Sequence, residues 1–261
     1  MKYSGNMLSL TKTLELISKD FKQTNILLNE YNYYSNVFTN KSNPKFLYRG
    51  ENDFYPQTLS NYQRLKGLNK IEYDILHKYM FDLSEFLAKK YFSIYDQNDP
   101  RYNPTIIELG AFLQHYGFPL HWLDLTKNIF VAAFFAIYQN TSGRGRIGII
   151  ETKNLINLNI PIYKLNGSIA RRPSIQEAFA IKVFDDIPDF KNTSHYNVKW
   201  IDLLINKDDV QKFSNSKILS TIGDQISYTV VNYIIANPMK SVKVKNIVNK
   251  IKDDLISCKS I

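Results

Sequence analysis

Cysteine is almost absent from this 261-residue sequence, whose one thiol belongs to Cys258. A lone cysteine cannot form an internal disulfide, and it excludes a zinc site built from several thiolates. Long apolar runs are also missing, since no segment reaches the roughly 18 uncharged apolar residues that suggest a membrane span. The N-terminal segment carries scattered charges and no continuous apolar run, so we expect no signal peptide, no membrane contact and a cytoplasmic location.

The sequence also lacks a P-loop motif and a regular βαβ order of elements. Both absences argue against a P-loop or Rossmann enzyme. Hydrophobic residues make up 44% and charged residues 22% of the chain, so a packed core is expected. Because strand-like and helix-like segments are mixed irregularly, we predict a single α+β domain with a small mixed or antiparallel sheet and several helices.

Acidic residues are outnumbered by basic ones, which leaves a formal net charge of +9. A basic surface attracts polyanions, so nucleotides, nucleic acids and acidic proteins are the expected classes of partner. The same excess of lysine and arginine also keeps a chain rich in tyrosine and isoleucine soluble. Charge alone does not choose between these two interpretations.

Apolar periodicity and turn residues divide the chain into helices and strands. Helices are predicted over 8–34, 69–95, 105–116, 127–139, 207–217, 224–236 and 241–256. Strands are predicted over 44–53, with a break at Gly50, and over 146–151, 177–184 and 198–205, with a loop over 98–104. We expect an N-terminal helical segment at 1–39, the main domain at 40–235 and a C-terminal helix at 236–261.

The stretch ELGAFLQHYGFPLHWLDLT, residues 108–126, concentrates polar side chains next to the most apolar predicted helix. His115 is a candidate base or hydrogen-bond donor, whereas the six-residue spacing of the two histidines matches no common metal motif, so we expect no metal site. Asp124 and Thr126 are predicted to cap the helix 127–139, whose first free N–H groups would form an anion site. Because that helix is apolar on all sides, we expect it to be buried beneath a pocket.

Arg49 follows three hydrophobic or aromatic residues in FLYRGEND, at the end of a predicted strand. An arginine held there suits bidentate binding of phosphate or carboxylate. Gly50 lets the backbone turn sharply and lets a ligand approach closely. The alternative for Arg49 is a salt bridge to Glu51.

A third polar segment, RRPSIQEAF at 171–179, leads into a predicted strand. Alternation along the strand places Gln176 on one face and Glu177 on the other, together with the core residue Phe179. Gln176 is therefore expected to face a pocket, although Glu177 is the only acid of the segment. An ordinary strand start is the alternative.

These three segments resemble the FRG domain family, named for its Phe/Tyr-Arg-Gly motif, which is YRG at 48–50 here. The second family motif, Gln-His-Tyr-Gly-x-Pro-Thr-Arg-Leu-Leu-Asp-Trp-Thr, is similar to QHYGFPLHWLDLT. The departures from it are Leu120, His121, Trp122 and Leu125. The third motif, an arginine followed by Gln-x-Ala/Gly-Phe, resembles residues 172–179, and the whole resemblance extends over about residues 40–235.

The order of the motifs is also similar to that of ADP-ribosyltransferases of the Arg-Ser-Glu type, which implies a related core and NAD as the substrate. In those enzymes an aromatic-Arg-Gly strand precedes a Ser/Thr strand with its helix, and a Gln/Glu-x-Glu strand follows. The implied NAD-binding residues are Arg49, Gly50, Tyr116, Asp124 and Thr126. The implied catalytic residues are Arg49, His115, Gln176 and Glu177, although Ala178 stands where the second glutamate would be.

Members of the FRG family are bacterial or phage-linked, and some lie near defence systems, so the resemblance implies a toxin or abortive-infection effector in antiviral defence, with a cognate antitoxin. The first hypothesis is an NAD-dependent ADP-ribosyltransferase or NAD glycohydrolase. The second is a nuclease or RNA-targeting effector that uses His115 as acid or base and tyrosines as stacking platforms. The third is a non-catalytic module that recognises a phage or host component, such as a nucleic acid or protein target, with the polar motif as internal scaffolding. For an enzyme we expect the three motifs to surround one pocket, with Arg49 within about 15 Å of Asp124.

Overall fold

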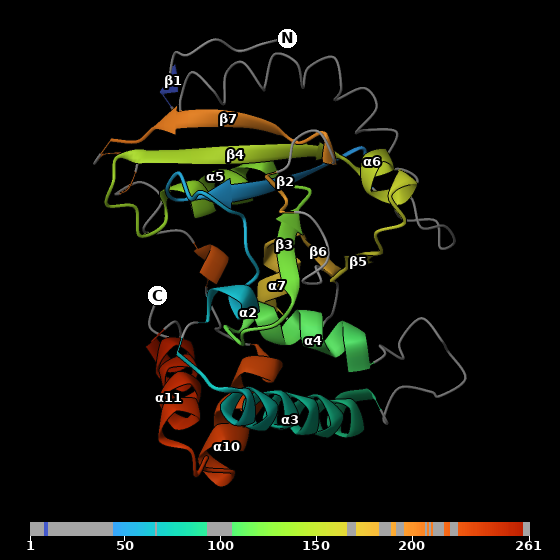
Figure 1. Ribbon diagram of the computed structural model, residues 1–261, viewed down its shortest axis with the longest axis vertical. Helices are drawn as coiled ribbons and strands as arrows, with labels where there is room; N and C mark the ends of the chain where they lie inside the picture. Colours follow the sequence, from blue (N-terminus) through green and yellow to red (C-terminus); the bar gives the residue numbers. More distant parts are fainter. Residues whose placement is uncertain are drawn as a thin grey trace.

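Seven strands form one sheet in the order β1-β7-β4-β2-β3-β6-β5 in the computed structural model of the chain (Figure 1). The structure describes residues 8–9, 44–65, 67–92, 106–165, 171–182, 189–191, 196–206, 208, 210, 217–219 and 224–257. The strands are β1 Leu8–Ser9, β2 Phe46–Glu51, β3 Trp122–Thr126, β4 Arg144–Glu151, β5 Ile162–Lys164, β6 Ala178–Lys182 and β7 Lys199–Leu204. β1 runs parallel to β7, and all other neighbouring strands are antiparallel.

Helices surround this sheet, so the predicted α+β class with a small mixed sheet is confirmed. The helices are α2 Asn61–Arg64, α3 Lys70–Leu87, α4 Ile106–His115, α5 Ile129–Ile137, α6 Thr152–Asn157, α7 Arg171–Ile175, α10 Gln225–Ala236 and α11 Val242–Ser257. A π-helical turn at Ala88–Phe92 extends α3, and a 3-10 turn spans Lys217–Leu219. Within the described part of the chain, no helix has the length and apolarity needed to cross a membrane.

Most predicted elements appear close to their expected positions. The helix expected at 69–95 is α3 with its π-helical turn, and those expected at 105–116, 224–236 and 241–256 are α4, α10 and α11. Of the segment 8–34, only Leu8–Ser9 is described, and it is a strand rather than a helix. The predicted loop 98–104 and most of the predicted helix 207–217 lie outside the described residues.

The helix caps predicted at Asp124 and Thr126 are wrong, because both residues belong to β3. In β3 they pair with Ala180 and Ala178 of β6. The N-cap of α5 is Asn128, whose side chain accepts a hydrogen bond from Phe130 N at 2.9 Å. Because pairing with β6 makes WLDLT a strand, the helix begins after Thr126 and its capping side chain is that of Asn128.

Three apolar cores hold these elements together. One joins α3, α4, α10 and α11 in a helical layer, which occupies the lower half of Figure 1. A second lies between α5 and one face of β2, β4 and β7, and α5 is largely buried there, as expected. The third covers the opposite side of the sheet with residues from β2, β3, β4 and β6. The sheet is therefore packed on both faces.

The sheet divides between β2 and β3. β2 pairs with β4 over six residues, whereas β2 and β3 share only the pair Tyr48 and Thr126. In Figure 1, β3 turns steeply away from the direction of β2 and β4. Because the backbone ladder stops at this pair, the residues that follow Tyr48 on β2 and those that precede Thr126 on β3 are separated by a gap between the two strands.

The strand break and sharp turn expected at Gly50 are wrong, because Gly50 pairs with Ile147 inside β2. Gly50 instead allows α5 to approach β2 closely. A Cβ atom on Gly50 would lie 1.9 Å from Ala132 O and 2.7 Å from Ala136 N, both in the backbone of α5. We expect Gly50→Ala to lower the free energy of unfolding by about 3 kcal/mol, since a helix backbone cannot move aside as a flexible side chain can. Urea unfolding measures this.

Gly110→Ala is the matched control. A Cβ there makes ordinary contact with Trp122 Nε1 at 3.5 Å, and alanine favours the helical backbone of α4. Its stability is expected to equal or exceed that of the wild type. Equal stability of the two variants would show that the contact between α5 and β2 tolerates an added methyl group.

Candidate functional site

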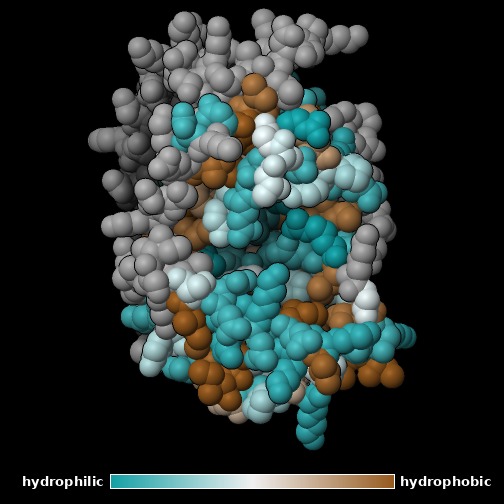
Figure 2. Space-filling model, turned by 90° about the vertical axis from the view of Figure 1, so that its left-hand side faces the viewer, coloured by the Kyte–Doolittle hydropathy of each residue, from teal (hydrophilic) through white to brown (hydrophobic). Residues whose placement is uncertain are grey.

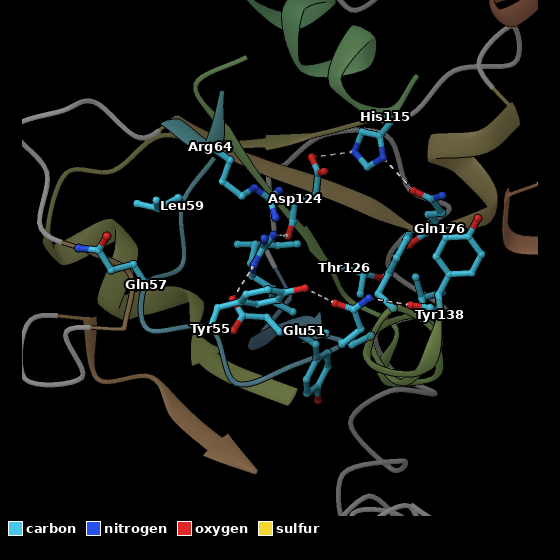
Figure 3. Close-up of a pocket in the computed structure, with 18 of the residues that line it drawn as sticks. Glu51, Tyr55, Gln57, Leu59, Arg64, His115, Asp124, Thr126, Tyr138 and Gln176 are labelled. Atoms are coloured by element: carbon cyan, nitrogen blue, oxygen red, sulfur yellow. Dashed lines mark hydrogen bonds and ion pairs between the residues drawn. The ribbon is translucent and has the colours of Figure 1, made fainter. Parts of the chain in front are cut away.

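A cavity of about 450 Å³ opens where β2 and β3 diverge, within the size range of small-molecule sites. Figure 2 shows a hollow bordered mainly by hydrophilic residues, and Figure 3 shows the side chains within it. The lining side chains with candidate chemistry are Arg49, Glu51, Arg64, His115, Asp124, Thr126 and Gln176. α5 contributes Val131, Ala132 and Phe135 to the wall. The three sequence motifs therefore meet at one cavity beside the buried helix, as expected.

Arg49 bridges the gap between the diverging strands. Its Nη1 donates to the backbone carbonyl of Asp124 at 2.9 Å, which confirms the expected proximity of the two residues. Its Nε lies 3.6 Å from Glu51 Oε1, so the salt bridge considered as an alternative is also present. The guanidinium has five N–H donors, and these two contacts leave donors on Nη2 for a ligand in the cavity. Structural and ligand-binding roles are therefore compatible.

Glu51 is a buried acid whose charge is already offset. Its Oε1 accepts a hydrogen bond from Thr58 Oγ1 at 2.7 Å, and its Oε2 lies 3.1 Å from Lys191 Nζ. With Arg49 on the other side, this carboxylate is held between two cations. Glu51 thereby anchors the loop 52–59 to β2. Asp124, the other acid among the described lining residues, is then the candidate catalytic acid or base.

Gln176 orients the imidazole of His115. Gln176 Nε2 donates to Ile218 O at 3.1 Å, which turns the amide oxygen toward His115 Nδ1 at 2.8 Å. An amide oxygen only accepts, so Nδ1 carries a proton, and in the neutral form of the ring the lone pair is on Nε2. Among the described residues Nε2 has no hydrogen-bond partner, and Asp124 Oδ1 lies 3.4 Å away. This is the arrangement of a positioned base.

Asp124 is fixed by the residue that precedes His115. Gln114 Nε2 donates to Asp124 Oδ1 at 2.7 Å, and Gln114 Oε1 accepts from Trp122 N at 3.1 Å, so the amide orientation is determined at both ends. The Asp124 side chain keeps 37% exposure, whereas that of His115 keeps 4%. The carboxylate is therefore held rigidly but remains accessible from the cavity.

Thr126 connects backbone segments around the cavity through hydrogen bonds of its hydroxyl group. Its hydroxyl donates to Gln176 O at 2.7 Å and accepts from Asn128 N at 2.9 Å. It thereby ties the end of β3 to the turn before β6 and to the start of α5. With its donor in use, Thr126 supports the position of Gln176 more directly than it can bind a ligand.

Tyr116 and Arg172 lie behind the cavity rather than in it. Tyr116 is buried, and its hydroxyl donates to Asp224 Oδ2 at 2.7 Å; burial and the Asp224 carboxylate raise its pKa well above the ordinary value. Arg172 Nη1 donates to the backbone carbonyl of His115 at 3.0 Å, and Nη2 donates to Leu219 O at 2.7 Å. The expected ligand contact of Tyr116 is thus not found, because these two residues hold the C-terminal end of α4 in place.

Glu177 points away from the cavity, as strand alternation predicts and contrary to its expected catalytic position. Its backbone is left-handed, with φ 45°, and its carboxylate pairs with Lys127 at 3.0 Å. Gln176, the preceding residue, is 3% exposed and lines the cavity. The left-handed turn lets two consecutive side chains face opposite directions.

Several lining residues were not found by sequence reasoning. They are Tyr48, Asn52, Tyr55, Pro56, Gln57, Leu59, Arg64 and Tyr138. Tyr55 donates to Asn52 Oδ1 at 2.6 Å, and Asn52 Nδ2 donates to Tyr138 O at 2.9 Å, so the loop after β2 is fastened to the end of α5. Except for Tyr48 of the YRG motif, these residues lie outside the motifs, and the loop after β2, the helix α2 and the end of α5 bring them to the cavity. Burial raises the pKa of Tyr48 to about 12, so its hydroxyl remains protonated.

A glycine pattern in the chain has a structural explanation. Gly143, Gly145 and Gly148 have the spacing G-x-G-x-x-G, but they lie in a turn and in β4 rather than between a strand and a helix. A Cβ on Gly145 would lie 2.7 Å from Ala136 O. The glycines make room for α5 and neighbouring side chains, and the spacing does not form a dinucleotide-binding loop.

Comparison with known proteins agrees with the first two motifs. Residues 44–144 match the family model of the FRG domain. The match includes β2, α2, α3, α4, β3 and α5, and it ends before the segment that carries Gln176. No curated protein and no solved structure shows a significant match to the chain. The domain limits 40–235 and the functional roles of the site residues stay predictions.

Proposed function

We propose that this FRG-domain protein binds NAD and breaks its glycosidic bond, as an ADP-ribosyltransferase or an NAD glycohydrolase. The observation that carries the proposal is the convergence of Arg49, His115 and Asp124 on one cavity from β2, α4 and β3. The three motif segments also lead into or lie on neighbouring strands β2, β3 and β6. The resemblance to ADP-ribosyltransferases implies a similar sequence of motif-bearing strands.

The lining has the groups that a dinucleotide needs. The remaining donors of Arg49 suit a phosphate, which a planar guanidinium binds through two parallel hydrogen bonds. Aromatic rings of Tyr55, Phe135 and Tyr138 face the same space, and flat bases stack on such rings. The cavity is polar on the side of β3 and partly apolar along α5.

In the proposed reaction, Asp124 and His115 are the acting side chains. The bond between ribose C1′ and the nicotinamide nitrogen breaks, and its electron pair leaves with nicotinamide. The Asp124 carboxylate stabilises the positive charge that develops on the ribose. The oxygen of water, or of a target side chain, then bonds to C1′ while His115 Nε2 accepts its proton. Asp124 thereby takes the role for which Glu177 was considered.

The biological setting belongs to the same proposal. A toxin or abortive-infection effector that consumes NAD, or modifies a target with it, requires control by an antitoxin or a trigger. The resemblance to FRG proteins linked to bacteria and phages supports this setting. The cavity supports only the nucleotide-binding part of it.

Incubation with NAD labelled in the nicotinamide ring tests the proposal. We expect NAD to raise the melting temperature of the protein, because a ligand selective for the folded state stabilises it. We also expect release of free nicotinamide, with transfer of ADP-ribose to protein or nucleic acid if extract is present. Absence of both effects would refute the proposal.

A nuclease is the second candidate, and the unbonded Nε2 of His115 favours it. An oriented imidazole beside a carboxylate and an arginine can also remove a proton from a ribose hydroxyl in RNA. RNA cleavage that is lost in His115→Ala, in a protein that neither binds NAD nor releases nicotinamide, would replace the first candidate with this one.

A further inference from the structure

Arg64 enters the cavity from α2, a short helix outside the motifs. Figure 3 shows its side chain reaching toward Asp124. The helix is stabilised by a capping box, in which Gln63 N donates to Ser60 Oγ at 3.2 Å and Ser60 N donates to Gln63 Oε1 at 2.9 Å. Arg64 therefore extends from an ordered turn, although its side chain is exposed.

α2 is attached to the segment that leads into β3. Tyr62 N donates to Leu120 O at 3.3 Å, and the Tyr62 ring packs on the His121 ring with centroids 3.8 Å apart. His121 stands where the FRG motif has an arginine. The chain thus supplies a guanidinium to the cavity from α2, and the helix that carries it rests on the altered motif position.

Within the described part of the chain Arg64 forms no ion pair, although the carboxylates of Asp124 and Glu51 act on its charge. Among the ion pairs formed by described residues, none involves Arg64, and its guanidinium donates to the neutral Asn61 Oδ1. Partial desolvation is the largest cause that lowers the pKa of Arg64, and the charge of Arg49 lowers it further, whereas the carboxylates of Asp124 and Glu51 raise it. Two guanidinium groups that repel each other across one cavity are favoured when an anion lies between them.

We propose that Arg64 and Arg49 together bind the diphosphate of the nucleotide, Arg64 from α2 and Arg49 from β2. The inference rests on the proposed function for the identity of the nucleotide, while the diphosphate can be tested separately. A diphosphate carries charge on both phosphates, so each guanidinium has an acceptor group. A single phosphate or an uncharged nucleoside offers no phosphate acceptor to at least one of the two arginines.

Calorimetric titration of the full chain with ADP, inorganic pyrophosphate and adenosine tests the inference. We expect Arg64→Gln to lower the affinity for ADP and for pyrophosphate by about 10- to 100-fold, because one charge-assisted contact is lost. Adenosine affinity should stay within about twofold, since no phosphate is involved. Arg64→Lys should recover only part of the loss, because a point charge lacks the fork geometry.

Lys78→Gln is the matched control, since it removes one positive charge from a side chain that is 77% exposed on α3. Its ADP affinity should equal that of the wild type. The inference fails if wild-type protein binds neither ADP nor pyrophosphate, if Arg64→Gln binds both normally, or if adenosine weakens as much as ADP. Arg64-dependent ADP binding without nicotinamide release overturns only the proposed reaction, whereas nicotinamide release with a KM unaffected by Arg64→Gln overturns only the diphosphate site.

Discussion

Arg49→Ala is expected to abolish the thermal stabilisation by NAD and to reduce nicotinamide release by at least about 100-fold. Two charge-assisted hydrogen bonds to phosphate contribute roughly 3 kcal/mol or more, which corresponds to this factor. The substitution also removes the contact between Arg49 and Asp124 O, so part of the loss comes from the position of β3. Nicotinamide release and the melting temperature, measured on the same samples, separate activity from folding.

Arg49→Lys distinguishes ligand binding from strand bridging. A lysine keeps the charge beside Glu51 and can reach one acceptor, so we expect a melting temperature near that of the wild type. It lacks the planar fork, so less than about one tenth of the activity should return. Full activity in a folded Arg49→Ala protein, or full recovery in Arg49→Lys, would show that Arg49 acts only within the fold.

Asp124→Asn is expected to lower kcat by about 100- to 1,000-fold while KM changes less than about threefold. The amide keeps the shape of the side chain, and its oxygen can still accept the hydrogen bond from Gln114 Nε2. Only the negative charge is lost, and that charge acts on the transition state more than on bound NAD. Steady-state kinetics of nicotinamide release measure the effect.

Glu177→Gln is the matched comparison, because it removes an acid from the third motif without changing the cavity lining. Its carboxylate pairs with Lys127, so kcat should remain within about twofold of the wild-type value. The opposite result, a slow Glu177→Gln and an active Asp124→Asn, would reverse the assignment of the two acids. It would mean that the turn at Glu177 rearranges when substrate binds.

Local patterns in the sequence predicted much of this structure. The apolar spacing along α3, α4, α10 and α11 indicated helices close to their observed bounds, because a helix that buries one face needs that spacing. The meeting of the three polar segments was also predictable, since each combined polar residues with an adjoining apolar element. Alternation along residues 175–183 predicted that Gln176 would face the pocket, and it does line the cavity, although it lies in the turn before β6.

Other features depended on partners distant in the chain. Asp124 and Thr126 were expected to cap a helix, and pairing with β6 made them strand residues instead. Tyr116 was expected at the ligand, but its hydroxyl donates to Asp224, more than 100 positions later. Local propensity cannot include a hydrogen bond to a segment that has not yet been placed.

The sequence by itself determined the fold class, most helices and the residues that form the polar cluster, because these follow from periodicity and residue type. Only the tertiary structure decided which side chains face the cavity. The divergence of β2 from β3 opens that cavity, and the position of α2 brings Arg64 to it. The amide oxygen of Gln176 accepts a hydrogen bond from His115 Nδ1, which leaves Nε2 on the side of Asp124. Each of these results depends on contacts between segments far apart in the chain, which residue order alone does not specify.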